Sequence, residues 1–352
     1  SFTETKKFFL AGDIGGTNTN FGIFSLDTKN PVLLFSVHYK SKEIEKFPET
    51  VKHLCNYIKA EYNIEIDNAV FGAAGVVKQN RLYAQPTNTK WPIDVVEIKK
   101  ITGIKNLILI NDFEAVGFGI ESVDPKDIAI INKGIENPKA QRACLGAGTG
   151  MGKSLLIWTE SLNMYIPQPS EGGHADFIVH DKEEFGFLEF MQKNISDLMG
   201  IAENKNCVIS WEHVLSGRGI QYIYLYLKEI RNYKPNQYSQ EIEAKDFNPD
   251  RISHFAQVDP QSKETFLWYS KFYARCAKNL ALDMLALNGI YIAGGIAAKN
   301  LAVFKDQVFM DEFLACNRQI DLLKNIPIKI ILDYNVSLYG AVIAGKYFGI
   351  IK

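Results

Sequence analysis

The chain has 352 residues, of which 47% are hydrophobic, and its 39 basic residues balance 40 acidic ones to a net charge of -1. This length is generous for one compact core and suits two lobes, while the balanced charge gives no broad attraction to nucleic acid or to an anionic membrane. The five cysteines are scattered without a CxxC pair, which argues against a zinc knuckle or a disulfide framework and favours reduced thiols in a cytoplasmic protein.

The N-terminal part of the chain alternates apolar strands with amphipathic helices. Val51, Leu54 and Ile58 recur at helical spacing behind Pro48. Asp94 stands three residues before Glu97, as an N-cap should. We therefore expect strands and helices in the order Phe8–Asp13, Phe21–Ser25, Val32–Tyr39, a helix over Pro48–Tyr62, Ala69–Ala73, a short helix after Asp94, and Leu107–Ile110.

The rest of the chain repeats this order on a larger scale. The expected elements are strands at Ala143–Leu145 and Ser154–Trp158, a helix-rich stretch over Glu183–Asn288, strands at Ile290–Ala293 and Ile328–Leu332, and a helix over Val336–Phe348. Leu280–Ala298 is nearly long enough to span a bilayer, but three glycines divide it into a helix, a turn and a strand. The repeated order predicts two α/β lobes that face a cleft suited to a nucleotide.

A glycine turn follows each of three predicted strands. Gly15 and Gly16, with donors on Thr17 and Asn18, would let the backbone approach phosphate oxygens, and Asp13 could hold Mg²⁺ through water. A plain β-hairpin explains this turn equally well. The other turns carry Gly148, Thr149 and Gly150, and Gly294 and Gly295. At the third turn a nucleoside could lie against the backbone, and close helix–strand packing is the alternative.

The second turn overlaps a pattern close to the Walker A motif, ending in Lys153-Ser154. A P-loop must open into a helix whose N-terminus faces the phosphates. Here Leu155–Trp158 is an apolar run that reads as a strand. We therefore interpret the loop as a hairpin that touches phosphate and the Lys-Ser pair as incidental.

Several polar side chains form a candidate catalytic and sugar-binding set. Asp112, with Asn111, ends a buried strand and could accept the proton of an attacking hydroxyl; the alternative is that Asp112 only N-caps the following helix. Glu171 and His174 flank two glycines and could face one small polar ligand. A zinc site there would need more ligands at metal spacing than Asp176 provides. Taken alone, Glu212 is an ordinary helix-face acid and Asn88 a surface-loop residue.

Together and in this order the motifs resemble those of the bacterial-type glucokinases, within the actin-like sugar-kinase superfold. The resemblance implies two lobes of duplicated ribonuclease-H-like units around a central cleft, with residues 1–122 plus 333–352 in a small lobe and 123–332 in a large one. The segments that carry it are Gly12–Asn18, Asn111–Phe113, Gly146–Gly150, Glu171–His174, Val214–Gly217 and Ile292–Ile296.

The resemblance also implies roles. Asp112 would be the general base for the 6-hydroxyl of glucose, and ATP with Mg²⁺ would be the phosphoryl donor, in a protein that is commonly dimeric. The residues that would bind the other sugar hydroxyls are Asn88, Asn111, Glu171, His174 and Glu212. The ATP site would comprise Asp13, Gly15, Gly16, Thr17, Asn18, Gly148, Thr149, Gly150, Gly294 and Gly295.

Two departures and several alternatives stand beside this interpretation. Asn20 occupies a position where many relatives carry Arg or Ala, and Asn232–Arg251 reads as a polar insertion. A kinase for another hexose, a donor such as ADP or polyphosphate, and a sugar sensor without catalysis are the alternatives. A sensor that binds DNA would need a helix-turn-helix, for which the residues before Phe8 leave no room.

Overall fold

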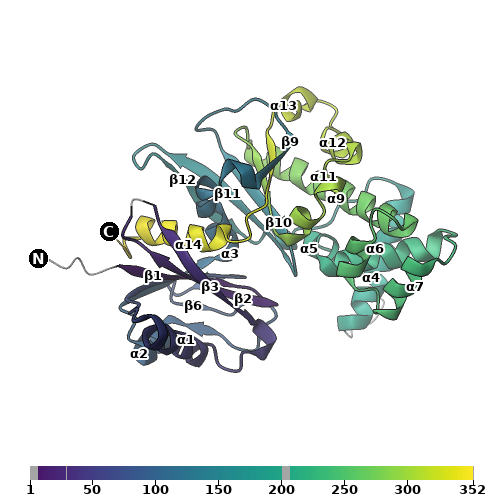
Figure 1. The fold of residues 1–352 in the computed structure, drawn as a ribbon. Coiled ribbons are helices and arrows are strands. Elements are labelled where there is room, and N and C mark those ends of the chain that lie inside the picture. The colour runs from purple at the N-terminus through teal and green to yellow at the C-terminus, as the bar shows by residue number, and fades with distance from the viewer. Residues whose placement is uncertain (1–6, 29, 200–206, 352) are drawn as a thin grey trace, which may run out of the picture. The chain divides into compact units, whose positions relative to one another are not determined.

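The computed structural model describes residues 7–28, 30–199 and 207–351. The chain divides into two compact units, of which the first comprises residues 1–128, 154–170 and 333–352 and the second 129–153 and 171–332. Each unit has its own helices (Figure 1) and its own hydrophobic core.

The first unit is built on a five-stranded sheet of order β3-β2-β1-β4-β8. β1 pairs antiparallel with β2 and parallel with β4, and β4 pairs parallel with β8. The strands are β1 (Phe8–Ile14), β2 (Asn18–Ser25), β3 (Val32–Lys40), β4 (Asn68–Ala73) and β8 (Asn106–Asn111). Each contains the strand expected at that place in the sequence.

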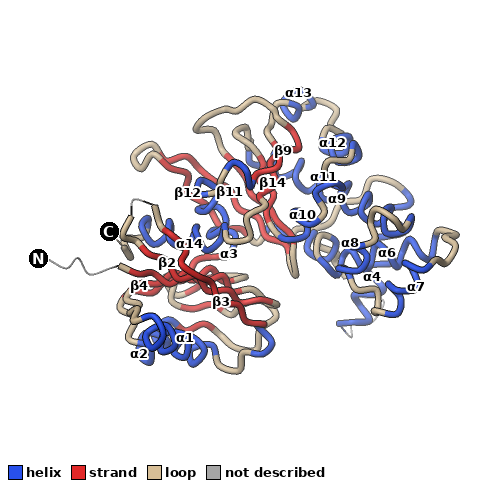
Figure 2. Tube along the Cα trace, viewed as in Figure 1, coloured by secondary structure: helices blue, strands red, loops and turns tan. Residues whose placement is uncertain are grey.

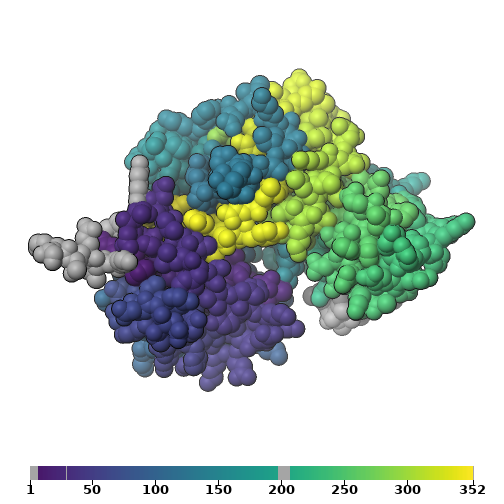
Figure 3. Space-filling view, in the orientation of Figure 1, coloured from purple at the N-terminus to yellow at the C-terminus, as the bar shows by residue number. Residues whose placement is uncertain are grey.

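Helices cover both faces of this sheet. Alternate residues of β1 point to opposite faces, and because both sets are apolar, each face is buried under helices. Leu10 belongs to the core beneath α1 (Phe47–Tyr62) and α2 (Val95–Thr102), whereas Phe9 and Ala11 pack with α3 (Asp112–Gly119) and α14 (Val336–Tyr347). Figure 2 shows α1 and α2 in blue along one side of the red strands. In Figure 3 the yellow atoms of the closing segment lie beside the purple atoms of the N-terminal strands.

Local signals explain where the first unit's helices begin and end. Pro48 occupies the first turn of α1, and Asn63 ends that helix in the left-handed conformation. Asp94 caps α2 as expected, accepting hydrogen bonds from the backbone nitrogens of Val96 and Glu97. The remaining elements of this unit include short pieces that the sequence did not indicate: β5 (Val77–Lys78), β6 (Tyr83–Ala84), β7 (Ile93–Asp94), β12 (Met164–Ser170), and the 3-10 turns Ser41–Glu43, Ile120–Ser122 and Pro125–Asp127.

The second unit contains the parallel strands β10 (Arg142–Ala147), β13 (Ile290–Ala293) and β14 (Ile328–Ile331), followed in the sheet by β9 (Ile128–Asn132). β11 (Met151–Thr159) leaves this unit after its third residue and continues into the first. The second unit also has a 3-10 turn at Gly172–His174. Its helices are α4 (Lys182–Met199), α5 (Trp211–Val214), α6 (Gly217–Ile230), α7 (Gln237–Ala244), α8 (Pro249–His254), α9 (Pro260–Met284), α10 (Gly295–Lys299), α11 (Leu301–Phe304), α12 (Gln307–Phe313) and α13 (Ile320–Lys324).

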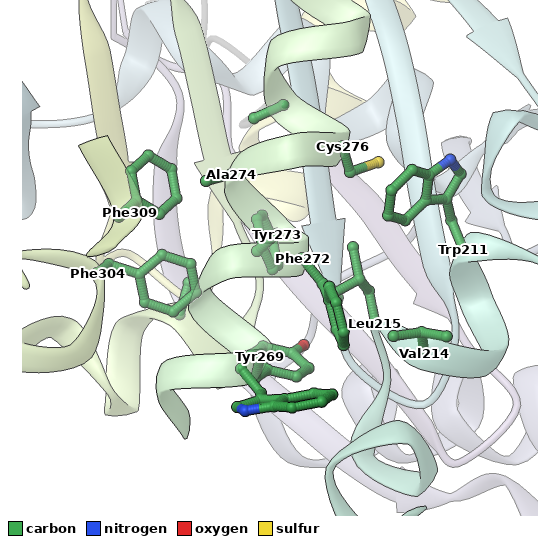
Figure 4. Close-up of a cluster of buried hydrophobic side chains, with 14 of the residues drawn as sticks. Trp211, Val214, Leu215, Tyr269, Phe272, Tyr273, Ala274, Cys276, Phe304 and Phe309 are labelled. Atoms are coloured by element: carbon green, nitrogen blue, oxygen red, sulfur yellow. The ribbon is translucent and has the colours of Figure 1, made fainter. Parts of the chain in front are cut away.

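The central helix of this unit is α9, whose side chains are mostly buried. Figure 4 shows Tyr269, Phe272 and Tyr273 of α9 between the side chains of α5 and those of α11 and α12. Asp259 caps the helix by accepting a hydrogen bond from the backbone nitrogen of Ser262 at 2.8 Å. Aromatic side chains from several helices therefore pack together in the core of the second unit.

Two stretches singled out in the sequence have definite structures. Leu280–Ala298 comprises the end of α9, a turn, β13 and the start of α10, as expected. In the part of the chain that the structure describes, none of the helices has the length and apolar character needed to cross a membrane. The polar insertion Asn232–Arg251 contains α7 and the start of α8, capped by Asn236 and Asn248.

Candidate functional site

Three parallel strands of the first unit end at the same edge of their sheet. Ile14 pairs with Ala73, and Ala73 pairs with Asn111. Open α/β sheets bind ligands at the carboxyl ends of their strands. The glycine turn after β1 and the Asn111-Asp112 pair after β8 therefore lie on one edge of the sheet, the edge at which such sheets usually bind ligands.

Ser41 holds the turn after β1 through two hydrogen bonds. The Ser41 hydroxyl donates to the carbonyl of Gly15 at 2.6 Å, and its backbone nitrogen donates to the carbonyl of Thr17 at 2.9 Å. Inside the turn, the nitrogen of Gly15 donates to the carbonyl of Asn18 at 2.9 Å. These bonds fix the backbone at the point where the sequence predicts phosphate contacts.

The same turn packs against the loop that carries Asn88. A Cβ atom on Gly16 would lie 2.4 Å from the carbonyl oxygen of Thr87 and 3.0 Å from the Cβ of Asn88, so any side chain at position 16 would push the two segments apart. Asn88 is exposed and left-handed, with φ of 64°. The first unit therefore brings a predicted nucleotide residue and a predicted sugar residue together.

Asp13 is tied to the closing helix. The hydroxyl of Ser337 in α14 donates to Oδ2 of Asp13 at 2.8 Å. Burial raises the pKa of Asp13, and the bond from Ser337 offsets only part of that rise. Within residues 7–28, 30–199 and 207–351 no three His, Cys, Asp or Glu side chains gather as a metal site. A site with few protein ligands of this kind suits Mg²⁺, which keeps most of its water when it is bound.

The expectation that Asp112 caps the following helix is wrong, because Asn111 is the cap. Its side-chain oxygen accepts from the backbone nitrogens of Phe113 at 2.9 Å and Glu114 at 3.2 Å, and the Glu114 carboxylate accepts from the nitrogen of Asn111 at 3.2 Å. Asp112 is instead the first residue of α3, where its Oδ1 accepts from the nitrogen of Phe113 at 2.9 Å. The capping box thus fixes the backbone around the predicted base.

The second unit holds the other predicted residues around the hairpin that joins β10 and β11. The nitrogen of Gly148 donates to the carbonyl of Gly150 at 2.8 Å, and the nitrogen of Gly217 donates to the carbonyl of Gly148 at 3.0 Å. Lys153 and Ser154 lie buried within β11, so the prediction that they enter a strand and not a P-loop helix is confirmed. Gly148 and Thr149 are exposed at the tip of the turn.

Met151 joins this hairpin to the predicted sugar residues. Its backbone nitrogen donates to Oε2 of Glu212 at 3.0 Å. A Cβ on Gly173 would lie 2.0 Å from the carbonyl oxygen of Met151, so the turn between Glu171 and His174 lies directly against it. Nε2 of His174 is 3.6 Å from Oε2 of Glu171. These three polar side chains and the glycine hairpin therefore form one cluster in the second unit.

The third glycine turn also reaches this hairpin. Gly294 has a φ of 99°, and a Cβ there would lie 2.7 Å from the carbonyl oxygen of Ala147. Gly295 then begins α10. Close packing is therefore enough to explain the glycine at position 294, which was one of the two interpretations drawn from the sequence. The same packing places the third turn beside Ala147, the residue before Gly148.

Three supporting residues were not expected from the sequence. Ser41 and Ser337 hold the glycine turn and Asp13 from distant parts of the chain, and no local pattern marks them. Glu114 did leave a signal, because Asn111 and Glu114 have the spacing of a capping box. That spacing would have assigned the cap to Asn111.

Comparison with known proteins identifies relatives of the whole chain. The family model described as Glucokinase matches residues 10–347. A glucokinase from Nostoc punctiforme is 34% identical over 349 residues, which cover 94% of this chain and 97% of the relative.

Solved structures share the fold. The structure of a glucokinase from Balamuthia mandrillaris in complex with glucose matches with a TM-score of 0.81 at 19% identity, covering 98% of this chain and 95% of that one. A ROK family glucokinase from Streptomyces griseus in complex with glucose and AMPPNP matches with a TM-score of 0.63 at 15% identity, covering 96% of this chain and 98% of that one. The expected actin-like α/β fold is confirmed.

Proposed function

Because the chain belongs to the glucokinase family, we propose that it is a sugar kinase that transfers the terminal phosphoryl group of ATP to the 6-hydroxyl of glucose. The observation that carries the mechanism is Asp112, a carboxylate at the carboxyl end of β8 and at the first position of α3. Its strand neighbours β4 and β1 end at the same edge, and β1 leads into the glycine turn.

Asp112 is the general base in this mechanism. The hydroxyl of the sugar loses its proton to the carboxylate as its oxygen attacks the phosphorus, and the second product is ADP. Support comes from the Asn111 cap, which holds the backbone of Asp112 in one conformation. A base that is fixed in this way needs little rearrangement before proton transfer.

The remaining sugar hydroxyls are bound by Asn88, Asn111, Glu171, His174 and Glu212. All five carry hydrogen-bonding groups, and the pairs Asn88 with Gly16 and Glu212 with Met151 place them next to the glycine turns. Such groups reject an analogue that lacks a hydroxyl, since the partner would lose its hydrogen bond while the bound sugar shields it from water, at a cost of up to ~10⁴-fold in kcat/KM. This selectivity favours glucose over a hexose with a different hydroxyl pattern.

ATP is bound through the glycine turns, whose backbone nitrogens approach phosphate oxygens without interference from side chains. Bound with ATP, Mg²⁺ would neutralise charge on the transferring phosphoryl group, and Asp13 would hold it through water. The partly buried Asp13 fits this role, because burial raises its pKa and a nearby cation would favour its charged form.

The experiment that tests the function measures ADP release from ATP and Mg²⁺, with and without glucose, for the wild type, Asp112→Ala and the control Asp67→Ala. Asp67 is an exposed acid of the same unit, paired with Lys105 at 3.0 Å. We expect glucose-dependent turnover whose kcat falls by roughly 10²–10⁴-fold in Asp112→Ala alone, with glucose binding still measurable. A near-normal kcat in Asp112→Ala would refute the base, and glucose binding without turnover by the wild type from ATP, ADP or polyphosphate would refute the kinase.

Two expectations about the whole protein stay predictions. These are a cytoplasmic location and a homodimer. Sedimentation of the purified protein would test the second directly.

A further inference from the structure

Arg81 lies in a strained loop that is fastened to the strand leading to the predicted base. Gln79, Asn80 and Arg81 are consecutive left-handed residues, with φ of 53°, 52° and 71°. Residues other than glycine adopt this backbone conformation at a cost in free energy, so it persists where surrounding contacts impose it. Two of those contacts join Arg81 to Leu109 in β8: the nitrogen of Leu109 donates to the Arg81 carbonyl at 2.9 Å, and Nη1 of Arg81 donates to the Leu109 carbonyl at 3.3 Å.

The guanidinium of Arg81 forms a two-pronged ion pair with Glu114. Nη1 lies 3.0 Å from Oε2 and Nη2 lies 2.9 Å from Oε1. The Glu114 side chain is 3% exposed and that of Arg81 is 31% exposed. The guanidinium also lies 4.1 Å from the ring centroid of Phe348, directly after α14. Parallel hydrogen bonds and a flat aromatic contact fix the orientation of the group as well as its charge.

The carboxylate of Glu114 has a second role at the same time. Its Oε2, which accepts from Arg81, also accepts from the backbone nitrogen of Asn111 at 3.2 Å. Asn111 is the cap of α3, and Asp112 is the next residue. Arg81, Glu114 and Asn111 are therefore linked in series, and the series ends on the backbone nitrogen of Asn111, in the residue directly before Asp112. In Figure 1 α3 lies beside α14, and Phe348, the residue after α14, supplies the aromatic ring at the other end.

We propose that Arg81 is a positioning residue: paired with Glu114, it holds the Asn111-Asp112 turn in the conformation that phosphoryl transfer requires. This role rests on the proposed function of Asp112 as the base. Without Arg81, the buried Glu114 carboxylate would lose its cation and would turn toward water, which would release the nitrogen of Asn111. Displacing a base by ~1 Å can cost ~10²-fold in rate, because proton transfer depends steeply on geometry.

The test compares Arg81→Met, Arg81→Lys, Glu114→Gln and the double variant Arg81→Met/Glu114→Gln with the wild type. Lys105→Met is the control, since it removes an ion pair of the same unit whose side chains are 70% and 51% exposed. Each protein is assayed for kcat, for glucose dissociation by calorimetry without ATP, and for thermal stability. The control should match the wild type in all three.

We expect Arg81→Met to lower kcat by ~10-fold or more while glucose affinity changes by less than ~3-fold, since several other groups hold the sugar. Arg81→Lys should recover part of the rate, because an ammonium supplies the charge without the fork. The double variant should lose no more rate than the worse single variant, since the two side chains act through one contact.

Two results would overturn the positioning role. One is a wild-type kcat in the folded Arg81→Met protein, accompanied only by a lower melting temperature, which would make the pair purely structural. The other is a rate loss in the double variant equal to the product of the single losses. In both cases the wild type still phosphorylates glucose, so the proposed function stands. A wild type that is inactive with every donor would refute the proposed function and the positioning role together.

Discussion

Glu184→Gln should destabilise the second unit, because Glu184 is the centre of a buried ionic cluster. The side chains of Glu184 and Arg275 are each 1% exposed, and Arg275 donates to both carboxylate oxygens at 2.7 and 2.9 Å. Lys271 lies 2.7 Å from the same carboxylate. Burial alone would raise the pKa of Glu184, but the hydrogen bonds from Arg275 and Lys271 outweigh it and lower the pKa to about 2.

The magnitude follows from that pKa. A shift from 4.5 to about 2 corresponds to about 3 kcal/mol of unfolding free energy. Since the folded pKa is the lower one, this contribution is complete well above the unfolded pKa and is lost as the pH falls toward 2. Between pH 7 and pH 4 the loss is about 1 kcal/mol. Removing one partner of a buried pair costs about 3–5 kcal/mol in other proteins, which agrees.

Urea unfolding at pH 7 and pH 4 would measure both effects, followed by tryptophan fluorescence. Trp211 and Trp268 report from the core of this unit. The control is Glu243→Gln, the same chemical change at an exposed acid that lies 2.8 Å from Lys228. We expect a large decrease in stability and a weaker pH dependence for Glu184→Gln only. An unchanged midpoint at pH 7, or a pH dependence equal to that of the wild type, would refute the reasoning.

Two further substitutions test the clusters at the glycine turns. Gly16→Ala should lower kcat/KM for ATP by ~10- to 100-fold, because its Cβ would meet the Thr87 carbonyl at 2.4 Å and shift the turn, whereas Gly217→Ala, with no atom nearer than 3.8 Å, should not; equal rates for the two variants would contradict the steric argument. Glu212→Ala should raise the KM for both glucose and ATP by ~10-fold or more, since it removes a sugar ligand and the acceptor of the Met151 nitrogen. A change in the glucose KM alone would separate Glu212 from the hairpin.

Elements with local signals were predictable. β1 and α2 follow from an apolar run and from the Asp94 cap, and the structure contains both. β12 was missed because Pro167 and Pro169 interrupt it, and prolines in a strand are tolerated mainly at the edge of a sheet. That edge position is a property of the assembled sheet and leaves no local trace.

The candidate site divides in the same way. Glycines mark the turns in the sequence, because no other residue fits against Thr87 or Ala147. The contacts that hold these turns join distant residues: Ser337 donates to Asp13, and Arg81 pairs with Glu114. Neither Ser337 nor Arg81 lies in a motif. A single sequence therefore indicates where ligand groups sit and leaves out the residues that support them.

The closing helix has a consequence for synthesis on the ribosome. The first unit takes its strands from the beginning of the chain but its α14 from Val336–Tyr347. α14 docks on α3 so closely that a Cβ on Gly340 would lie 1.7 Å from the Ala115 carbonyl. Until that helix emerges, Phe9 and Ala11 lack the part of their cover that α14 supplies, and Asp13 lacks Ser337. The nascent chain therefore carries an unfinished first unit, exposed to chaperones and proteases, while the second unit is already being built.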